Sequence, residues 1–151
     1  MIKTRDIFDA INREIVKVFP DYTVYIDTQP KDFKRPSFLL SYLTTTCQPK
    51  GINTVEKSEY FLITVFINAD ELLNSDTTNL LDIQNDVLDI FSVGVIQVQD
   101  RFIAVSASAS GRDEDVIYID LQFTFFDERG IKQKTSETAE KVITNYIERN
   151  E

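Results

Sequence analysis

Apolar residues recur at helical spacing in two long segments of the chain. From residue 4 to residue 19, one helical face collects Ile7, Phe8, Ile11, Ile15, Val18 and Phe19. Thr4 is expected to cap this helix, and Pro20 to end it, because proline cannot continue the backbone hydrogen bonds. A second apolar stripe predicts a helix over 76–91; it consists of Leu80, Ile83, Val87 and Ile90.

Six further segments have the apolar content and the alternation of β-strands. They are 22–27, 37–46, 58–68, 93–98, 101–108 and 116–126. With a third amphipathic segment over 136–149, the order of elements is α-β-β-β-α-β-β-β-α. This order predicts an α+β fold, a mainly antiparallel meander flanked by helices. The composition shows no break, so we expect one domain over 1–151, with a core over 1–130 and a polar stretch and helix over 131–151.

The predicted strands carry more apolar surface than a sheet with one wet face needs. Residues 60–63, for example, are apolar at four consecutive positions and so on both faces. Two helices can cover one face of a six-stranded sheet, and the third could cover part of the other. Either the chain covers the remaining surface itself, or a neighbouring subunit does. The C-terminal helix could dock on its own domain or reach such a neighbour.

The excess of acidic over basic residues restricts the kinds of molecule that this chain can bind. Sixteen basic and 25 acidic residues give a net charge of −9, which disfavours tight binding to nucleic acid but allows it to slide past. The start of the chain has no apolar leader, and no run is long enough to span a membrane. We therefore expect synthesis in a reducing cytoplasm, where Cys47, the single cysteine, is a structural thiol.

The commonest general base and metal ligand of enzymes, histidine, is missing from the chain. Ser-His and Cys-His nucleophile pairs are therefore excluded. There is no glycine-rich phosphate loop and no Cys/His cluster for zinc. The acidic run 113–115 matches no calcium-loop spacing and is interpreted as a solvated turn. We therefore expect a non-enzymatic protein without cofactor or metal.

Two connections and one helix face supply the candidate interaction residues. The connections 28–36 and 47–57 are long for this sheet, and long loops often carry function. Their candidate contact residues are Lys31, Phe33, Lys34, Arg35, Lys50 and Ile52. Asp82, Asp86 and Asp89 share one face of the second helix. They form either its ordinary solvated side or a negative surface lining a channel through which DNA passes.

Several segments resemble a known family. Residues 1–7, 19–22, 24–27 and 33–38, together with the strand 117–123, are similar to the small tail-terminator proteins of phages and prophages of Gram-positive bacteria. The resemblance covers most of residues 1–126. It implies an α/β fold that assembles as a six-membered ring on the last ring of a tail tube. Such a ring stops tube polymerisation, presents a surface to the head connector and lets DNA pass through its lumen.

The resemblance also implies partners and a place. We expect a homo-oligomer, a hexameric ring, that contacts the tail tube protein and the head connector in the virion tail or neck after assembly in the host cytoplasm. Three alternatives remain open. They are a head–tail connector or tail-completion protein, a non-viral cytosolic adaptor, and an enzyme that uses only carboxylates, Tyr or Lys.

Overall fold

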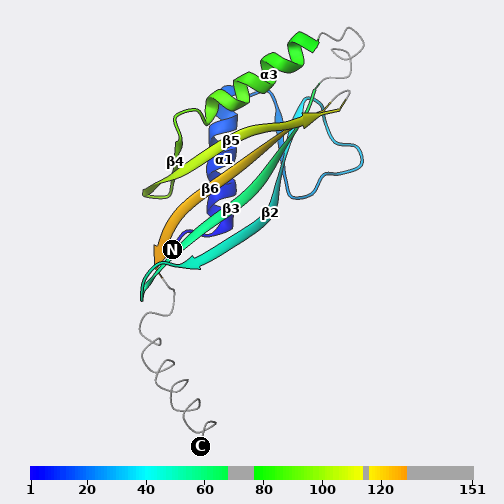
Figure 1. Cartoon of the computed structure of the whole chain (residues 1–151). Helices are drawn as coiled ribbons and strands as arrows, with labels where there is room; N and C mark the ends of the chain where they lie inside the picture. The colour runs from blue at the N-terminus through cyan, green and yellow to red at the C-terminus, as the bar shows by residue number, and fades with distance from the viewer. Residues whose placement is uncertain (68–76, 114–115, 129–151) are drawn as a thin grey trace, which may run out of the picture.

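The computed structural model describes residues 1–67, 77–113 and 116–128. Figure 1 shows the elements, and their bounds are α1 Thr4–Val18, β1 Thr23–Ile26, β2 Ser37–Pro49, β3 Thr54–Phe66, α3 Thr77–Ile90, β4 Val95–Val98, β5 Arg101–Arg112 and β6 Val116–Glu128. The predicted α+β class is confirmed. The helix predicted over 136–149 lies outside the described residues.

The strands form one six-stranded sheet in the described part of the chain, in the order β1-β2-β3-β6-β5-β4. The prediction of a meander is therefore wrong, because β3 pairs with β6 and not with β4. The chain passes through α3 after β3 and resumes at the far edge of the sheet as β4. From there β5 and β6 return to the centre. The sheet is mixed, since β1 pairs parallel with β2 while the other pairs are antiparallel.

The second predicted loop is mostly strand. β2 and β3 continue to Pro49 and from Thr54, so the turn between them is only residues 50–53, and the interpretation of 47–57 as a long loop is wrong. The ladder runs without a break from Thr46, opposite Ser58, to Pro49. These residues alternate little in polarity because the outer half of β2 is exposed on both faces. The pattern of apolar positions therefore could not show that β2 continues to Pro49.

Both described helices contribute to one core on a single face of the sheet. α1 crosses behind the strands in Figure 1, and α3 contacts α1, β5 and β6. Alternate residues of β3, namely Phe61, Ile63 and Val65, are almost fully buried in this core. Phe61 lies at its centre, with its ring centroid 5.0 Å from that of Phe8 and 5.4 Å from that of Phe123. Such edge-to-face pairs add to the free energy of apolar burial.

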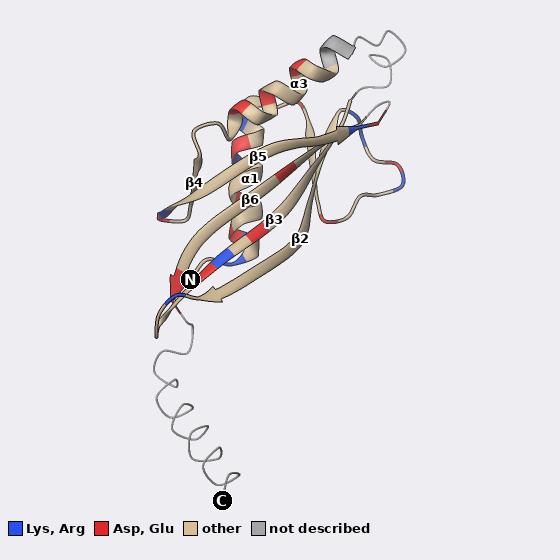
Figure 2. Cartoon of the chain, viewed as in Figure 1, with Lys and Arg blue, Asp and Glu red and all other residues tan. Residues whose placement is uncertain are grey.

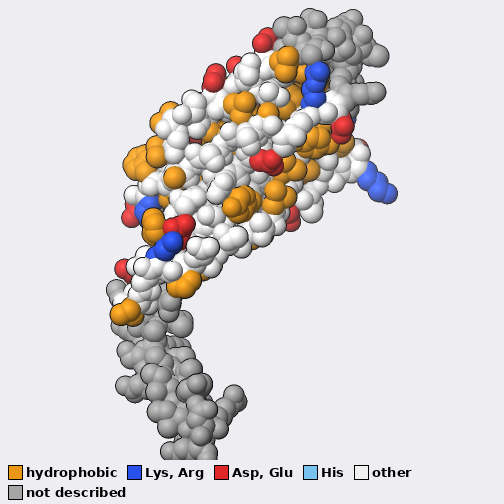
Figure 3. Space-filling model, in the orientation of Figure 1, with side chains coloured by type: hydrophobic (Ala, Val, Ile, Leu, Met, Phe, Trp, Pro, Cys, Tyr) orange, Lys and Arg blue, Asp and Glu red, His pale blue; other side chains and the backbone are white. Residues whose placement is uncertain are grey.

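The opposite face of the sheet is only partly buried. The residues of β3 between those of the core, such as Tyr60 and Leu62, lie on this face and are half-buried. They stand opposite Gln122 and Asp120 of β6. No helix or strand in the described ranges packs over this face, which we call the open face. It faces the viewer in Figure 3, where apolar side chains lie among polar ones.

Buried carboxylates hold the start of α1 against the sheet. Asp127 of β6 is only 6 % exposed. Its carboxylate accepts a hydrogen bond from the backbone N–H of Ile2 at 2.9 Å and forms an ion pair with Arg101 at 3.2 Å. Glu59 accepts a hydrogen bond from the Thr4 hydroxyl at 2.5 Å. The expected cap at Thr4 is therefore wrong: the cap position is Lys3, and the Thr4 side chain is used in this contact.

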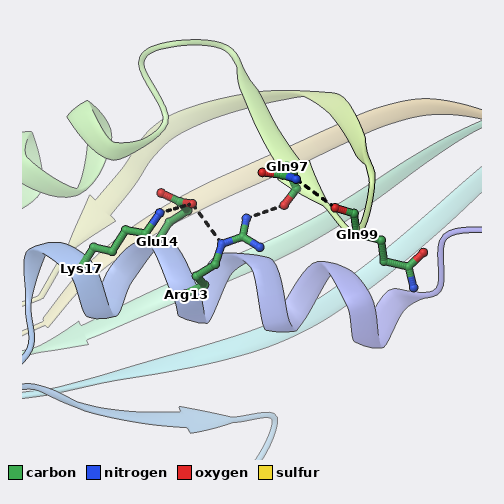
Figure 4. Close-up of polar contacts among 5 residues, drawn as sticks. All are labelled: Arg13, Glu14, Lys17, Gln97 and Gln99. Atoms are coloured by element: carbon green, nitrogen blue, oxygen red, sulfur yellow. Dashed lines mark hydrogen bonds and ion pairs between the residues drawn. The ribbon is translucent and has the colours of Figure 1, made fainter.

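A side chain of α1 ties β4 to the helix through a hydrogen bond, in addition to the core that the two elements share. Arg13 of α1 donates a hydrogen bond to the backbone carbonyl of Gln97, as Figure 4 shows. Glu14 holds the guanidinium from the other side at 3.3 Å and also pairs with Lys17 at 3.2 Å. The far edge of the sheet is thus fixed to the helix behind it.

We expect Asp127→Ala to lower the free energy of unfolding by about 2 kcal/mol, because the Ile2 N–H loses its acceptor in a buried position. Urea denaturation followed by circular dichroism measures this change. Asp9→Ala, at an exposed position of α1, is the control and should change stability by less than about 0.5 kcal/mol. Equal stability of the two variants would contradict the anchoring role of Asp127.

Candidate assembly surfaces

The first predicted contact loop, 28–36, is held on the end of the sheet by its aromatic and arginine side chains. The ring of Phe33 packs against Phe66 of β3 with centroids 4.8 Å apart. The Arg35 guanidinium lies 5.2 Å from the Phe33 centroid and 5.5 Å from the Phe66 centroid, and it donates to the Ile67 carbonyl at 3.3 Å. Phe33 and Arg35 are therefore half-buried structural residues of this loop, whatever else they contact.

Lys31 and Lys34 are the cations that this loop exposes. Both side chains lie in solvent, and the Lys34 backbone N–H donates to the Tyr25 hydroxyl at 2.9 Å. The loop backbone is thus fixed while the two ammonium groups stay available. We call this pair the basic loop surface.

Lys50 and Ile52 lie at the other end of β2, in the turn that leads into β3. Ile52 is 84 % exposed, and Lys50 lies 3.9 Å from a carboxylate oxygen of Glu56. Because β2 is thirteen residues long, this turn is about 40 Å from the start of the strand. The six predicted contact residues therefore form two separate surfaces at opposite ends of the sheet.

The acidic residues Asp82, Asp86 and Asp89 are all exposed on α3, on the side away from buried Val87. Figure 2 shows the acidic positions spaced along this helix. Their placement agrees with both interpretations made from the sequence, a solvated side and a channel lining.

A hollow on the open face is the feature that the sequence pattern did not reveal. Its volume is about 440 Å³, and it is lined chiefly by residues of four adjacent strands: Leu43, Thr44, Tyr60, Ser106, Ser108, Asp120 and Gln122. The sequence feature that accompanies this hollow is the pair of small polar residues Ser106 and Ser108 in β5. They stand opposite Gln122 and Asp120 of β6. A partly apolar sheet face that no described element covers is a candidate surface for contact with another protein.

Large apolar side chains are also exposed at the two sides of the sheet. On the β2 side, Tyr42 is 39 % and Leu43 is 52 % exposed. On the β4 side the corresponding values are 78 % for Val93, 48 % for Val95 and 70 % for Phe102. These two apolar edges add to the surface that the described fold leaves uncovered.

The described ranges contain no group of three or more His, Cys, Asp or Glu side chains that could hold a metal ion. Among the same residues, no helix is long and apolar enough to cross a membrane.

A family model described as phage tail terminator protein matches residues 6–137 of the 151. The chain belongs to this family. The match includes every described strand, the sheet edges and both predicted contact loops, and it confirms the resemblance seen in the sequence. Membership of the tail terminator family places the protein in phage tail assembly, as a component of the virion tail or neck that interacts with tail tube and head. No curated protein matches the chain.

We expect Arg35→Ala to lower the free energy of unfolding by about 1–2 kcal/mol, since the stack on two rings and the bond to Ile67 are both lost. Lys34→Ala is the matched control and should lie within about 0.5 kcal/mol of the wild type. Thermal and urea unfolding of the three proteins test this difference. If Arg35→Ala unfolds like the wild type, the stack does not hold the loop.

Proposed function

We propose that this chain is the structural protein that caps the head-proximal end of the tail tube as a ring. It stops tube polymerisation, offers a docking surface to the head connector and catalyses no reaction. The observation that carries this proposal is the family match over residues 6–137, which includes nearly all of the described fold.

The two separate contact surfaces suit a ring that joins two different structures. A ring between tube and connector needs one docking surface on each of its ends. The basic loop surface and the turn around Lys50 and Ile52 lie at opposite ends of β2. Charge complementarity at the basic loop surface would then set register and choice of partner more than affinity.

The charge of the chain suits a lumen through which DNA passes. At a net charge of −9, each copy repels phosphate, and six copies in a ring multiply that effect. In this proposal the exposed carboxylates of Asp82, Asp86 and Asp89 on α3 line the lumen. DNA then slides through during ejection without binding to the wall.

Deletion of the gene from its phage or prophage tests the function. Electron microscopy of induced lysates should show tail tubes of uncontrolled, excessive length, because nothing stops polymerisation. A plasmid copy of the wild-type gene should restore the normal length. Detached tails of normal length beside filled heads would instead identify a connector or completion protein, and normal infectious particles would contradict a role in the tail.

The basic loop surface gives a second test. Reversing both exposed charges, Lys31→Glu with Lys34→Glu, should reduce incorporation into tails about tenfold while the unfolding temperature stays unchanged. Immunoblots of purified tails measure the incorporation. The control reverses two exposed charges elsewhere, Lys3→Glu with Arg5→Glu, and should leave it unchanged. Equal incorporation of both double variants would exclude this loop as a docking surface.

A further inference from the structure

Over half of its length, one side of β2 has no described strand beside it. β1 pairs with β2 only from Ser37 to Leu40, and the Asp27 N–H closes this contact by donating to the Leu40 carbonyl. From Tyr42 to Pro49, β2 pairs with β3 alone among the described strands. We call residues 42–49 the free β2 edge. An unpaired strand edge of this length is a template for a strand of another chain.

The register shows which backbone groups the free β2 edge presents. Leu40 directs its carbonyl away from β3, towards β1, and backbone direction alternates along a strand. The bulge between Tyr42 and Thr44 shifts this alternation by one residue. Thr45 and Cys47 therefore direct their N–H and C=O groups outward. Pro49 occupies the next outward position, where a missing N–H costs no bond to β3.

This edge lacks the charged side chains that usually protect a strand edge, and its bulge and its proline lie only at its two ends, at Tyr42–Thr44 and at Pro49. Although 27 % of the chain is charged, residues 41–49 contain no Asp, Glu, Lys or Arg. Sheet edges are commonly guarded by charged side chains, with lysine used most often. Figure 2 shows β2 without a charged residue along its length. Between the bulge and Pro49, no charged side chain on the free β2 edge opposes pairing with another strand.

The opposite side of the sheet has matching properties. Residues 90–99, which contain β4, are also free of charge. Beside β4, the exposed side chains of Val93, Val95 and Phe102 form an apolar strip. Arg13 donates to the carbonyl of Gln97, whereas the outward backbone groups of Val95 have no hydrogen-bond partner among the described residues. Two copies with a charge of −9 each repel one another, and neutral edges are where they can approach.

We propose that the free β2 edge of one copy packs against the β4 edge of a second copy, and that this contact closes the ring. The inference rests on the proposed function, because a ring supplies the second copy. The two edges are different surfaces, so the contact is head to tail and each copy uses both of its edges. Contacts of this kind generate a closed ring when the rotation from copy to copy closes and an open filament when it does not, whereas a contact of one surface with itself stops at a dimer.

Cys47 provides the reporter, because the chain's single cysteine lies on the free β2 edge and is exposed. Tails that carry the full-length Val95→Cys variant are treated with a short bismaleimide, whose spacer tolerates shifts in register. Denaturing gels should show a ladder of covalent multimers of this chain. The ladder should vanish when Cys47→Ser is added, and Asn85→Cys, at an exposed position of α3, should give no ladder.

Three results of the cross-linking experiment would overturn the inference. They are Cys47–Cys47 dimers from wild-type tails, Cys47 linked to the tube protein, and no link at all in tails that contain the Val95→Cys variant. Tail length in the same preparations separates the two claims. If tails have normal length but the cross-linked ladder is absent, the edge contact is excluded and the terminator function stands. If tails of the deletion strain also have normal length, the terminator function itself is excluded.

A backbone test does not depend on cross-linking chemistry. Cys47→Pro removes one outward N–H while leaving the ladder with β3 intact, as Pro49 already does two residues later. We expect its incorporation into tails to fall about tenfold relative to Cys47→Thr, with unfolding temperatures of the two variants alike. Equal incorporation of two equally stable variants would contradict pairing along this edge.

Discussion

The structure depends on one strand, β3, which is hydrogen-bonded along its whole length to β2 on one side and to β6 on the other. α1 packs across the face of this three-strand centre, with Phe61 of β3 against Phe8 of the helix. Apolar burial on that face supplies the core, and the anchors at Asp127 and Glu59 fix where the helix begins. The same arrangement sends both described helices to one side. The open face and the two sheet edges are its direct consequence.

Sequence patterns predicted those elements that bury one clear face. α1 follows from an unbroken apolar stripe that ends at Pro20, and α3 follows from the stripe around Val87. The last residues of β2, Cys47 to Pro49, were missed because all three are exposed and so show no alternation. Strand order could not be read either, since the pairing of β3 with β6 joins residues about sixty positions apart, as Phe61 and Leu121 show. Local periodicity holds no information about such a contact.

The candidate surface residues show the same division. Composition identified the loop 28–36 as basic, and the structure leaves Lys31 and Lys34 exposed. It could not show that Arg35 stacks on Phe66, because that ring comes from a strand 31 positions later in the chain. Lys50 and Ile52 belong to the second predicted connection, and only the length of β2 shows that they lie at the other end of the sheet from this loop. The hollow on the open face needs four strands in register, so it exists only in the folded sheet.

In the proposed ring, assembly thus covers the surfaces that folding leaves exposed. The uncharged sheet edges join neighbouring copies, and the two ends of the sheet contact the tail tube and the connector. A reconstruction of the neck of intact virions by electron cryo-microscopy tests this claim most directly. The account predicts a closed ring of this chain on the last ring of the tail tube, with β2 of each copy beside β4 of the next. A neck without this chain, or with a single copy of it, would contradict the account.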